Sequence, residues 1–190
     1  MNVIKTSLPG VFIIEPKVKS DNRGFFLEVY HKEKFAEFGI ISTFVQDNHA
    51  GSIRHTLRGL HYQVNHSQAK LCRVVVGDVQ DVVVDIRRGS PFFGKWESVI
   101  LSAENKRQIY IPKGFAHGYL VLSEYAEFLY KCDEYYTPEN ERGIVWNDPT
   151  IGIQWHREGL LVLSERDTHN PKLKDIPIED FPRYVSEDER

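Results

Sequence analysis

The stretch LCRVVVGDVQDVVVDIRRGSPFFGKWESVILS, residues 71–102, decides the fold of this chain. It contains three apolar runs rich in valine and isoleucine, separated by Gly-Asp at 77–78 and by RRGSP at 87–91. Residues branched at Cβ are frequent in β-strands, whereas glycine, proline, serine and aspartate are frequent in turns. The stretch therefore predicts three short strands joined by tight connections.

The same pattern extends in both directions from this stretch. Further short strands are expected at residues 11–14, 25–30, 42–48, 57–63, 109–112, 118–123 and 126–132. The best helix candidate is HKEKFAEFG at 31–39, which ends in a glycine. Many short strands with little helix between them predict an all-β antiparallel sandwich or barrel and exclude a parallel α/β sheet.

Length and composition bound the class of protein. With 190 residues, we expect one domain spanning 1–190, with a polar, irregular segment from about residue 138. The net charge is −3 and no Lys/Arg block could follow a phosphate backbone, so nucleic acid is not an expected partner. We expect neither a signal peptide nor a membrane span. Cys72 and Cys132 lack the spacing of zinc or redox motifs and are expected to be free thiols in a reducing cytoplasm.

LRGLHYQ at 57–63 places a cation, a glycine and a histidine in one apolar run. If side chains alternate along a strand, His61 shares a face with Gly59, while Arg58 and Tyr62 point the other way. A ligand could approach the backbone closely at Gly59, beside the imidazole. A single histidine in an apolar strand is more often a hydrogen-bonded core residue, so the rest of the chain has to decide.

Two histidines lie where a cupin-type barrel often binds a metal. IPKGFAHGY, containing His117, is similar to the second cupin motif, but the first motif is reduced to His61-Tyr62-Gln63 and lacks its second ligand. With one histidine in each half and no supporting carboxylate in the first, we expect no metal and no cofactor. A metal-dependent oxygenase that uses His61 and His117 is the alternative.

Two further residues suit proton transfer in such a barrel. Lys70 opens a predicted strand, so its ammonium can lie at the mouth of a pocket; a solvated lysine at a strand end is the default. In AEFLYKC, Ala126, Phe128 and Tyr130 share one face, and their types mark this face as inward. A buried tyrosine needs a hydrogen-bond partner, and a ligand can be that partner.

Long runs of the sequence resemble one family. SDNRGFFLEVY, TFVQDNH, LRGLHYQ, GDVQDVVVDIR, SPFFGKW, LSAENKRQIYIPKGFAHGYLVLSEYAEFLYK and WNDP, in this order, are similar to dTDP-4-dehydrorhamnose 3,5-epimerases. The resemblance implies a cupin-like jelly roll (a double-stranded β-helix) that forms a homodimer and needs no metal. It also implies epimerisation of dTDP-4-dehydro-6-deoxy-D-glucose at C3 and C5 in dTDP-L-rhamnose biosynthesis.

The resemblance implies roles for residues at matching positions. His61 resembles the general base, Asp167 the carboxylate that orients it, Tyr130 the acid on the opposite face of the sugar, and Lys70 the ammonium facing the enolate oxygen. Tyr136 matches a tyrosine near the thymine. The other positions that match substrate-binding residues are Arg23, Phe26, Glu28, Gln46, Asp47, Asn48, Arg58, His117, Glu141 and Arg166.

The chemistry of these residue types agrees with the implied reaction. Removing a proton next to a ketone creates an oxyanion that a cation can stabilise. Histidine titrates near working pH, and a phenol is a neutral donor for reprotonation.

Three points stay open. Asp81 and Asp85 compete with Asp167 as the partner of His61. One centre alone could be inverted, or a ketone isomerised. A non-catalytic nucleotide-sugar binding protein is also possible, although it would have no need for a base and an acid together.

Overall fold

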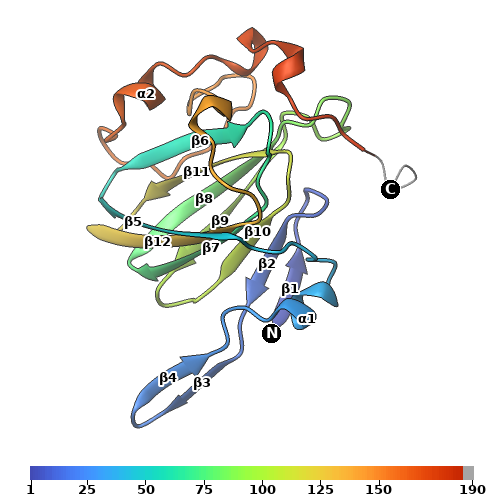
Figure 1. Ribbon diagram of the computed structural model, residues 1–190. Helices are drawn as coiled ribbons and strands as arrows, with labels where there is room; N and C mark the ends of the chain where they lie inside the picture. The colour runs from blue at the N-terminus through green and yellow to red at the C-terminus, as the bar shows by residue number, and fades with distance from the viewer. Residues whose placement is uncertain (186–190) are drawn as a thin grey trace.

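Two antiparallel sheets form the body of the molecule in the computed structural model, which describes residues 1–185 (Figure 1). The first sheet has the strand order β1 (Asn2–Lys5), β2 (Phe12–Glu15), β10 (Gln108–Ile111), β7 (Lys70–Val76), β12 (Tyr125–Cys132) and β5 (Gln46–Ile53). The second has the order β13 (Glu141–Gly143), β6 (Leu57–Gln63), β11 (Phe115–Val121), β8 (Asp78–Asp85) and β9 (Trp96–Ser102). Two facing sheets of this kind make a cupin-like jelly roll, so the predicted fold class is confirmed.

A separate hairpin projects away from the two sheets. It consists of β3 (Val18–Asp21) and β4 (Gly24–Leu27), which pair only with each other (Figure 1). The strand expected at 25–30 therefore ends at Leu27. Its ladder ends at the pair Val18 and Leu27, and Pro16, two residues before Val18, cannot donate a hydrogen bond that would carry the ladder further.

The valine-rich strand β8 is buried on both faces. Val79 and Val83 point into the core between the two sheets, whereas Val82 and Val84 pack beneath the C-terminal segment. A strand covered on both sides needs apolar residues in succession, because neither face meets water. This arrangement explains why Val82, Val83 and Val84 follow one another without a polar residue between them. The buried polar residues of the strand, Gln80, Asp81 and Asp85, have hydrogen-bond partners.

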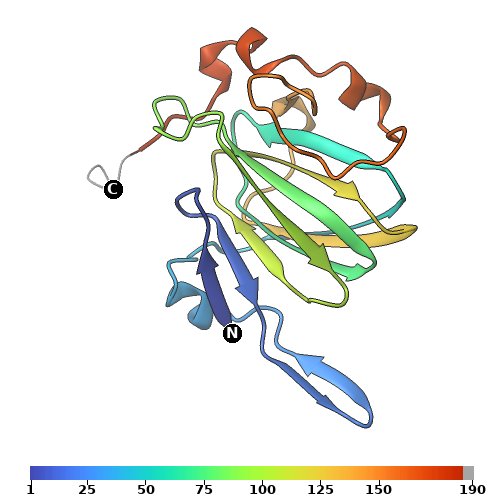
Figure 2. The ribbon, with the colours of Figure 1, turned by 180° about the vertical axis from the view of Figure 1, so that it is seen from behind.

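The outer faces of both sheets are covered by elements from the two ends of the chain. Residues 144–181 cross the five-stranded sheet and bury Ile144, Ile151 and Phe181 against it (Figure 2). This segment contains α2 (Glu165–Thr168) and two of the three 3₁₀ turns, η2 (Leu173–Asp175) and η3 (Ile178–Asp180); the other, η1 (Pro138–Asn140), precedes it. The helix expected at 31–39 is α1 (Lys32–Ala36), which is shorter than expected. It covers the six-stranded sheet with Phe35.

One strand begins later than expected. The strand predicted at 42–48 runs from Gln46 to Ile53 as β5, because its ladder with β12 begins at the pair Gln46 and Cys132. The polar residues at 46–48 thus belong to a strand and not to a turn. Within the described residues, no helix is long and apolar enough to cross a membrane.

Candidate active site

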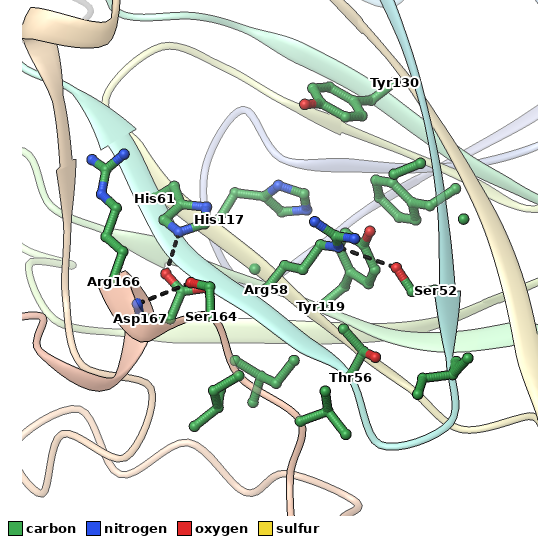
Figure 3. A pocket seen from close by; sticks show the side chains of 18 of the residues that line it. Ser52, Thr56, Arg58, His61, His117, Tyr119, Tyr130, Ser164, Arg166 and Asp167 are labelled. Atoms are coloured by element: carbon green, nitrogen blue, oxygen red, sulfur yellow. Dashed lines mark hydrogen bonds and ion pairs between the residues drawn. The ribbon is translucent and has the colours of Figure 1, made fainter.

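A cavity of about 670 Å³ opens between the sheets where β5, β6, β11 and β12 converge (Figure 3). The segment 162–167 closes one side of it. Eight of the residues that the sequence singled out line this cavity, namely Arg58, His61, Lys70, His117, Tyr130, Glu141, Arg166 and Asp167. Residues from both halves of the chain therefore converge on one space, which fits a small ligand.

His61 and Asp167 form a histidine–carboxylate pair in this cavity. His61 Nε2 lies 2.6 Å from Asp167 Oδ1. The backbone N–H of Asp167 donates to the hydroxyl of Ser164, which caps the short helix α2 and fixes where the carboxylate points. Only 3% of Asp167 is exposed, whereas the imidazole of His61 keeps a side open to the cavity.

Two opposing effects act on the pKa of Asp167. Burial raises it, but the hydrogen bond and the charge interaction with His61, together with hydrogen bonds from Ser164 and the N–H of Gly59, lower it below its ordinary value of 3.8. Asp167 is therefore ionised at neutral pH. A charged carboxylate in this position can hold one tautomer of His61 and stabilise its protonated form.

The expected alternation of side chains along β6 is wrong at Gly59. His61 pairs with His117 and Arg58 pairs with Tyr119, so β6 contains one residue more than β11 between these pairs. This bulge turns Arg58 to the same side as His61, and both line the cavity. Figure 3 shows the two side chains entering it from the same strand.

Gly59 serves this bulge and not a close approach by ligand. Its φ is +123°, and an added Cβ would lie 2.6 Å from the Cα of Gly118 on β11. The position next to it is therefore filled by a neighbouring backbone. A glycine is required for the local conformation and for strand packing.

The other candidate carboxylates have partners of their own. Asp81 Oδ2 lies 2.8 Å from Nε2 of His117, and Asp85 binds the guanidinium and the backbone N–H of Arg87. Neither competes for His61, whose partner is Asp167. The choice among the three carboxylates that the sequence left open is thereby decided.

Tyr130 enters the cavity from β12, in the sheet opposite His61 (Figure 3). It shares its face with the buried Ala126 and Phe128, as expected from the alternation. Burial, as the largest cause, raises the pKa of the Tyr130 phenol far above its ordinary value. Lys70, the first residue of β7, places its Nζ 5.7 Å from the centre of the Tyr130 ring. A neutral phenol and a cation therefore face the cavity together.

A cluster of polar side chains at the mouth of the cavity includes three of the predicted substrate-binding residues. Glu141 accepts hydrogen bonds from the hydroxyl of Tyr136, at 2.7 Å, and from the guanidinium of Arg166. Tyr136 does not itself line the cavity but lies beside it and is half exposed. An exposed aromatic ring next to an arginine can bind a base and its attached phosphates.

The residues predicted at 46–48 divide between the two faces of β5. Asn48 lies opposite Tyr130 in the ladder and donates to the thiol of Cys132, and Gln46 accepts from the backbone N–H of Tyr136. Asp47 points to the other face, where it pairs with Lys131. Gln46 and Asn48 thus share the face of β5 that carries Ser52, a cavity residue, although neither lines the cavity itself, and Asp47 points away from it.

Three predicted substrate-binding residues lie away from the cavity of their own chain. Arg23 and Phe26 belong to the projecting hairpin, where 69% of Phe26 is exposed. Glu28 follows it and binds Lys34. None of the three lines the cavity.

Several polar residues of the cavity were not predicted from the sequence. These are Ser52, which accepts a hydrogen bond from Arg58, and Thr56, Tyr119 and Ser164. The alternation along residues 115–121 could have placed Tyr119 beside His117. No sequence signal marks the others, because loops and strand ends from distant parts of the chain bring them in.

The described side chains offer a metal ion a different set of ligands from the histidine pair of the oxygenase alternative. Among residues 1–185, one group of three potential ligands meets the spacing of a metal site, and it consists of Cys72, Asp81 and His117. His61 is not in it. The alternative of an oxygenase that uses His61 and His117 together therefore gains no support from the geometry.

Fold and site together define an acid–base enzyme of the cupin-like jelly-roll class, with a histidine–aspartate pair and a phenol on two walls of one cavity. The family model for dTDP-4-dehydrorhamnose 3,5-epimerase matches residues 5–175. The chain belongs to the dTDP-4-dehydrorhamnose 3,5-epimerase family, which confirms the predicted family and its class as an isomerase.

Individual relatives agree with this assignment. The chain is 56% identical to a dTDP-4-dehydrorhamnose 3,5-epimerase of Salmonella typhimurium, over 91% of this chain and 96% of that protein. It is similar to the structure of a dTDP-6-deoxy-D-glucose-3,5-epimerase from Legionella pneumophila in complex with dTDP-4-keto-L-rhamnose, with a TM-score of 0.96, 49% identity and coverage of 97% and 99%. A 3'-monoepimerase from Streptomyces bikiniensis in complex with dTDP-quinovose is less similar, with a TM-score of 0.84, 38% identity and coverage of 89% and 86%.

Proposed function

We propose that this chain epimerises dTDP-4-dehydro-6-deoxy-D-glucose at C3 and C5, giving dTDP-4-dehydro-L-rhamnose for dTDP-L-rhamnose biosynthesis. The observation that carries the proposal is the placement of His61 with Asp167 and of Tyr130 in opposite sheets around one cavity. Inversion of a carbon needs a base and an acid on opposite faces of the ring. The reaction needs no cofactor, since only protons move.

His61 is the proposed base. Asp167 binds one nitrogen of its ring, so the other can take the proton from the carbon next to the C4 ketone. The imidazolium formed is stabilised by the ionised carboxylate. Because C3 and C5 both neighbour C4, one base can serve both centres if the sugar turns within the cavity.

Lys70 is the proposed oxyanion partner. Loss of the proton moves negative charge onto the C4 oxygen, and an ammonium held inside a protein cavity stabilises this charge better than it could in bulk solvent. Lys70 lines the cavity from β7 and forms no salt bridge with another described residue, so its charge is available to the ligand.

Tyr130 is the proposed acid. Its phenol stays protonated at working pH because burial raises its pKa. It can therefore return a proton to the face opposite His61. One proton leaves the sugar and one arrives at each inverted centre, so the protons balance.

The nucleotide is proposed to bind at the polar cluster formed by Tyr136, Glu141 and Arg166. The guanidinium of Arg166 suits the pyrophosphate, and the ring of Tyr136 suits stacking near the thymine. Arg58 and His117 would then hold the sugar within the cavity, with Gln46 and Asn48 beside it on the same face of β5.

A homodimer is part of the proposal. The hairpin β3–β4 carries Arg23 and the exposed Phe26 away from its own cavity (Figure 1). If these residues bind substrate, as the family resemblance implies, they do so in the cavity of a second subunit. We also propose a cytoplasmic location, which suits the two free thiols, Cys72 and Cys132.

Incubation of the protein with dTDP-4-dehydro-6-deoxy-D-glucose in deuterated water tests the reaction. Product isolated and examined by NMR should carry deuterium at both C3 and C5. Label at one position only would replace the proposal with a single-centre epimerase, and a shifted ketone would indicate an isomerase. A protein that binds the nucleotide sugar but introduces no label would be a binding protein.

A further inference from the structure

A second group of chemically reactive side chains lies deeper than the proposed catalytic residues. Potential ligand atoms of Cys72, Asp81 and His117 all lie within 4.8 Å of one another, and all three residues are buried. Cys72 comes from β7 in the six-stranded sheet, whereas Asp81 on β8 and His117 on β11 come from the five-stranded sheet. The group therefore bridges the interior between the two sheets.

The carboxylate of Asp81 is only partly satisfied. Oδ2 is bound to the ring of His117 at 2.8 Å, but Oδ1 is buried and has no hydrogen-bond partner. An unpaired carboxylate oxygen inside a protein is costly, and a buried charge is normally compensated by a cation or by several donors. Within residues 1–185, the only positively charged candidate in contact with this carboxylate is the imidazole of His117.

We propose that Cys72, Asp81 and His117 form a binding site for a divalent transition-metal ion, with Zn²⁺ as the best fit, and that occupation of this site inhibits the enzyme. Thiolate, imidazole and carboxylate are the three ligand types that zinc binds in proteins, and three of them leave a fourth position open. An ion in this site would neutralise the buried charge of Asp81, of which one oxygen has no other partner.

The site adjoins the cavity through His117. His117 lines the cavity, and Cys72 lies directly opposite the cavity residue Tyr130 in the ladder between β7 and β12. The thiol of Cys72 is protonated when the site is empty, since burial and then the charge of Asp81 raise its pKa. Binding of the ion therefore releases this proton to solvent.

Inhibition follows from the position of His117. This side chain is a proposed sugar-binding residue, and a metal ion would take its lone pair and occupy the adjacent space. This part of the inference rests on the proposed function. Metal binding itself does not, because it can be measured without turnover.

Titration of the purified protein with Co²⁺ alone tests the site, since a cobalt–thiolate bond gives a charge-transfer absorption that carboxylate and imidazole do not. The wild type should bind one equivalent of Co²⁺ and show this absorption, and added Zn²⁺ should displace the Co²⁺. Cys72→Val should lose the band and bind Zn²⁺ at least about tenfold more weakly. Cys132→Val is the matched control, because Cys132 is also a buried free thiol on the adjacent strand. This variant should retain the cobalt–thiolate band and the affinity of the wild type for Zn²⁺.

X-ray absorption spectroscopy of the wild type with bound Zn²⁺ should show one sulfur ligand at about 2.3 Å. This measurement does not depend on whether the variants fold. In turnover assays, one equivalent of Zn²⁺ should lower kcat/KM at least about tenfold in the wild type, reversibly with a chelator, but not in Cys72→Val. Absence of a sulfur ligand, or a cobalt–thiolate band that survives in Cys72→Val, would overturn the site. A wild type that shows the band but no turnover at all would contradict the proposed function instead.

Discussion

Nε2 of His61 and Oδ1 of Asp167 lie 2.6 Å apart although 106 residues separate them in the chain. The first residue lies in the middle of a central strand, and the second lies in a one-turn helix of the irregular C-terminal segment. The C-terminal segment thus does two things. It covers the outer face of a sheet, and it delivers the carboxylate that binds the ring of His61, the proposed base.

Asp167→Asn should leave the fold intact and lower kcat by roughly 10²–10⁴-fold, because the amide cannot stabilise the imidazolium. Steady-state kinetics measures this loss. Asp175→Asn, in η2 of the same segment, is the control and should retain activity. If Asp167→Asn kept full activity, the carboxylate would have no part in the chemistry.

The same pair should affect stability at acid pH. The pKa of Asp167 in the folded protein is below 3.8. A carboxyl group of this kind stabilises the fold above its unfolded pKa, and the contribution disappears as pH falls through the lowered folded value. Unfolding by urea, measured from pH 6 to pH 2, should therefore show a shallower loss of stability below about pH 4 in Asp167→Asn than in the wild type. Parallel curves would show that the interaction with His61 does not lower this pKa.

Lys70→Gln should lower kcat by roughly 10²–10³-fold with little effect on stability, since the substitution removes the proposed partner of the enolate oxygen. Lys5→Gln, on the exposed edge strand β1, controls for a change in net charge. An effect on KM alone would assign Lys70 to binding and not to transition-state stabilisation.

Gly59→Ala should destabilise the fold by about 1–3 kcal/mol or more, since a Cβ there meets the backbone of Gly118 and the φ is positive. Denaturant unfolding measures the change. Gly39→Ala shares a positive φ but has open space around it, so it should cost only about 1 kcal/mol. Equal losses in the two variants would mean that the bulge in β6 tolerates a side chain.

Arg23→Gln should raise KM several-fold while leaving the cavity of its own chain unchanged, if the hairpin reaches a second subunit. Sedimentation should show a dimer in the wild type. Lys19→Gln, on the same hairpin, is the matched control. A fully active monomer would refute the shared site.

Much of the fold was predictable because strand patterns are local. The runs at 57–63 and 71–86 became β6, β7 and β8 with nearly the expected bounds. The alternation at 126–130 placed Tyr130 inward, which is where it lies. The single-domain organisation and the roles of the site residues stay predictions.

The parts that could not be predicted depend on long-range contacts. The bulge at Gly59, which turns Arg58 toward His61, results from the approach of β11. The choice of Asp167 over Asp81 and Asp85 depends on how the C-terminal segment folds back. No local pattern distinguishes three aspartates whose partners lie in other strands.

The central claim is that His61 and Tyr130 act on opposite faces of one bound sugar, and deuterium exchange in the two variants His61→Ala and Tyr130→Phe tests it most directly. With the keto sugar in deuterated water, Tyr130→Phe should return labelled substrate with little inverted product, because the base still removes a proton and the acid is missing. His61→Ala should return substrate without label. Inversion at the wild-type rate in Tyr130→Phe, or continued exchange in His61→Ala, would contradict the account.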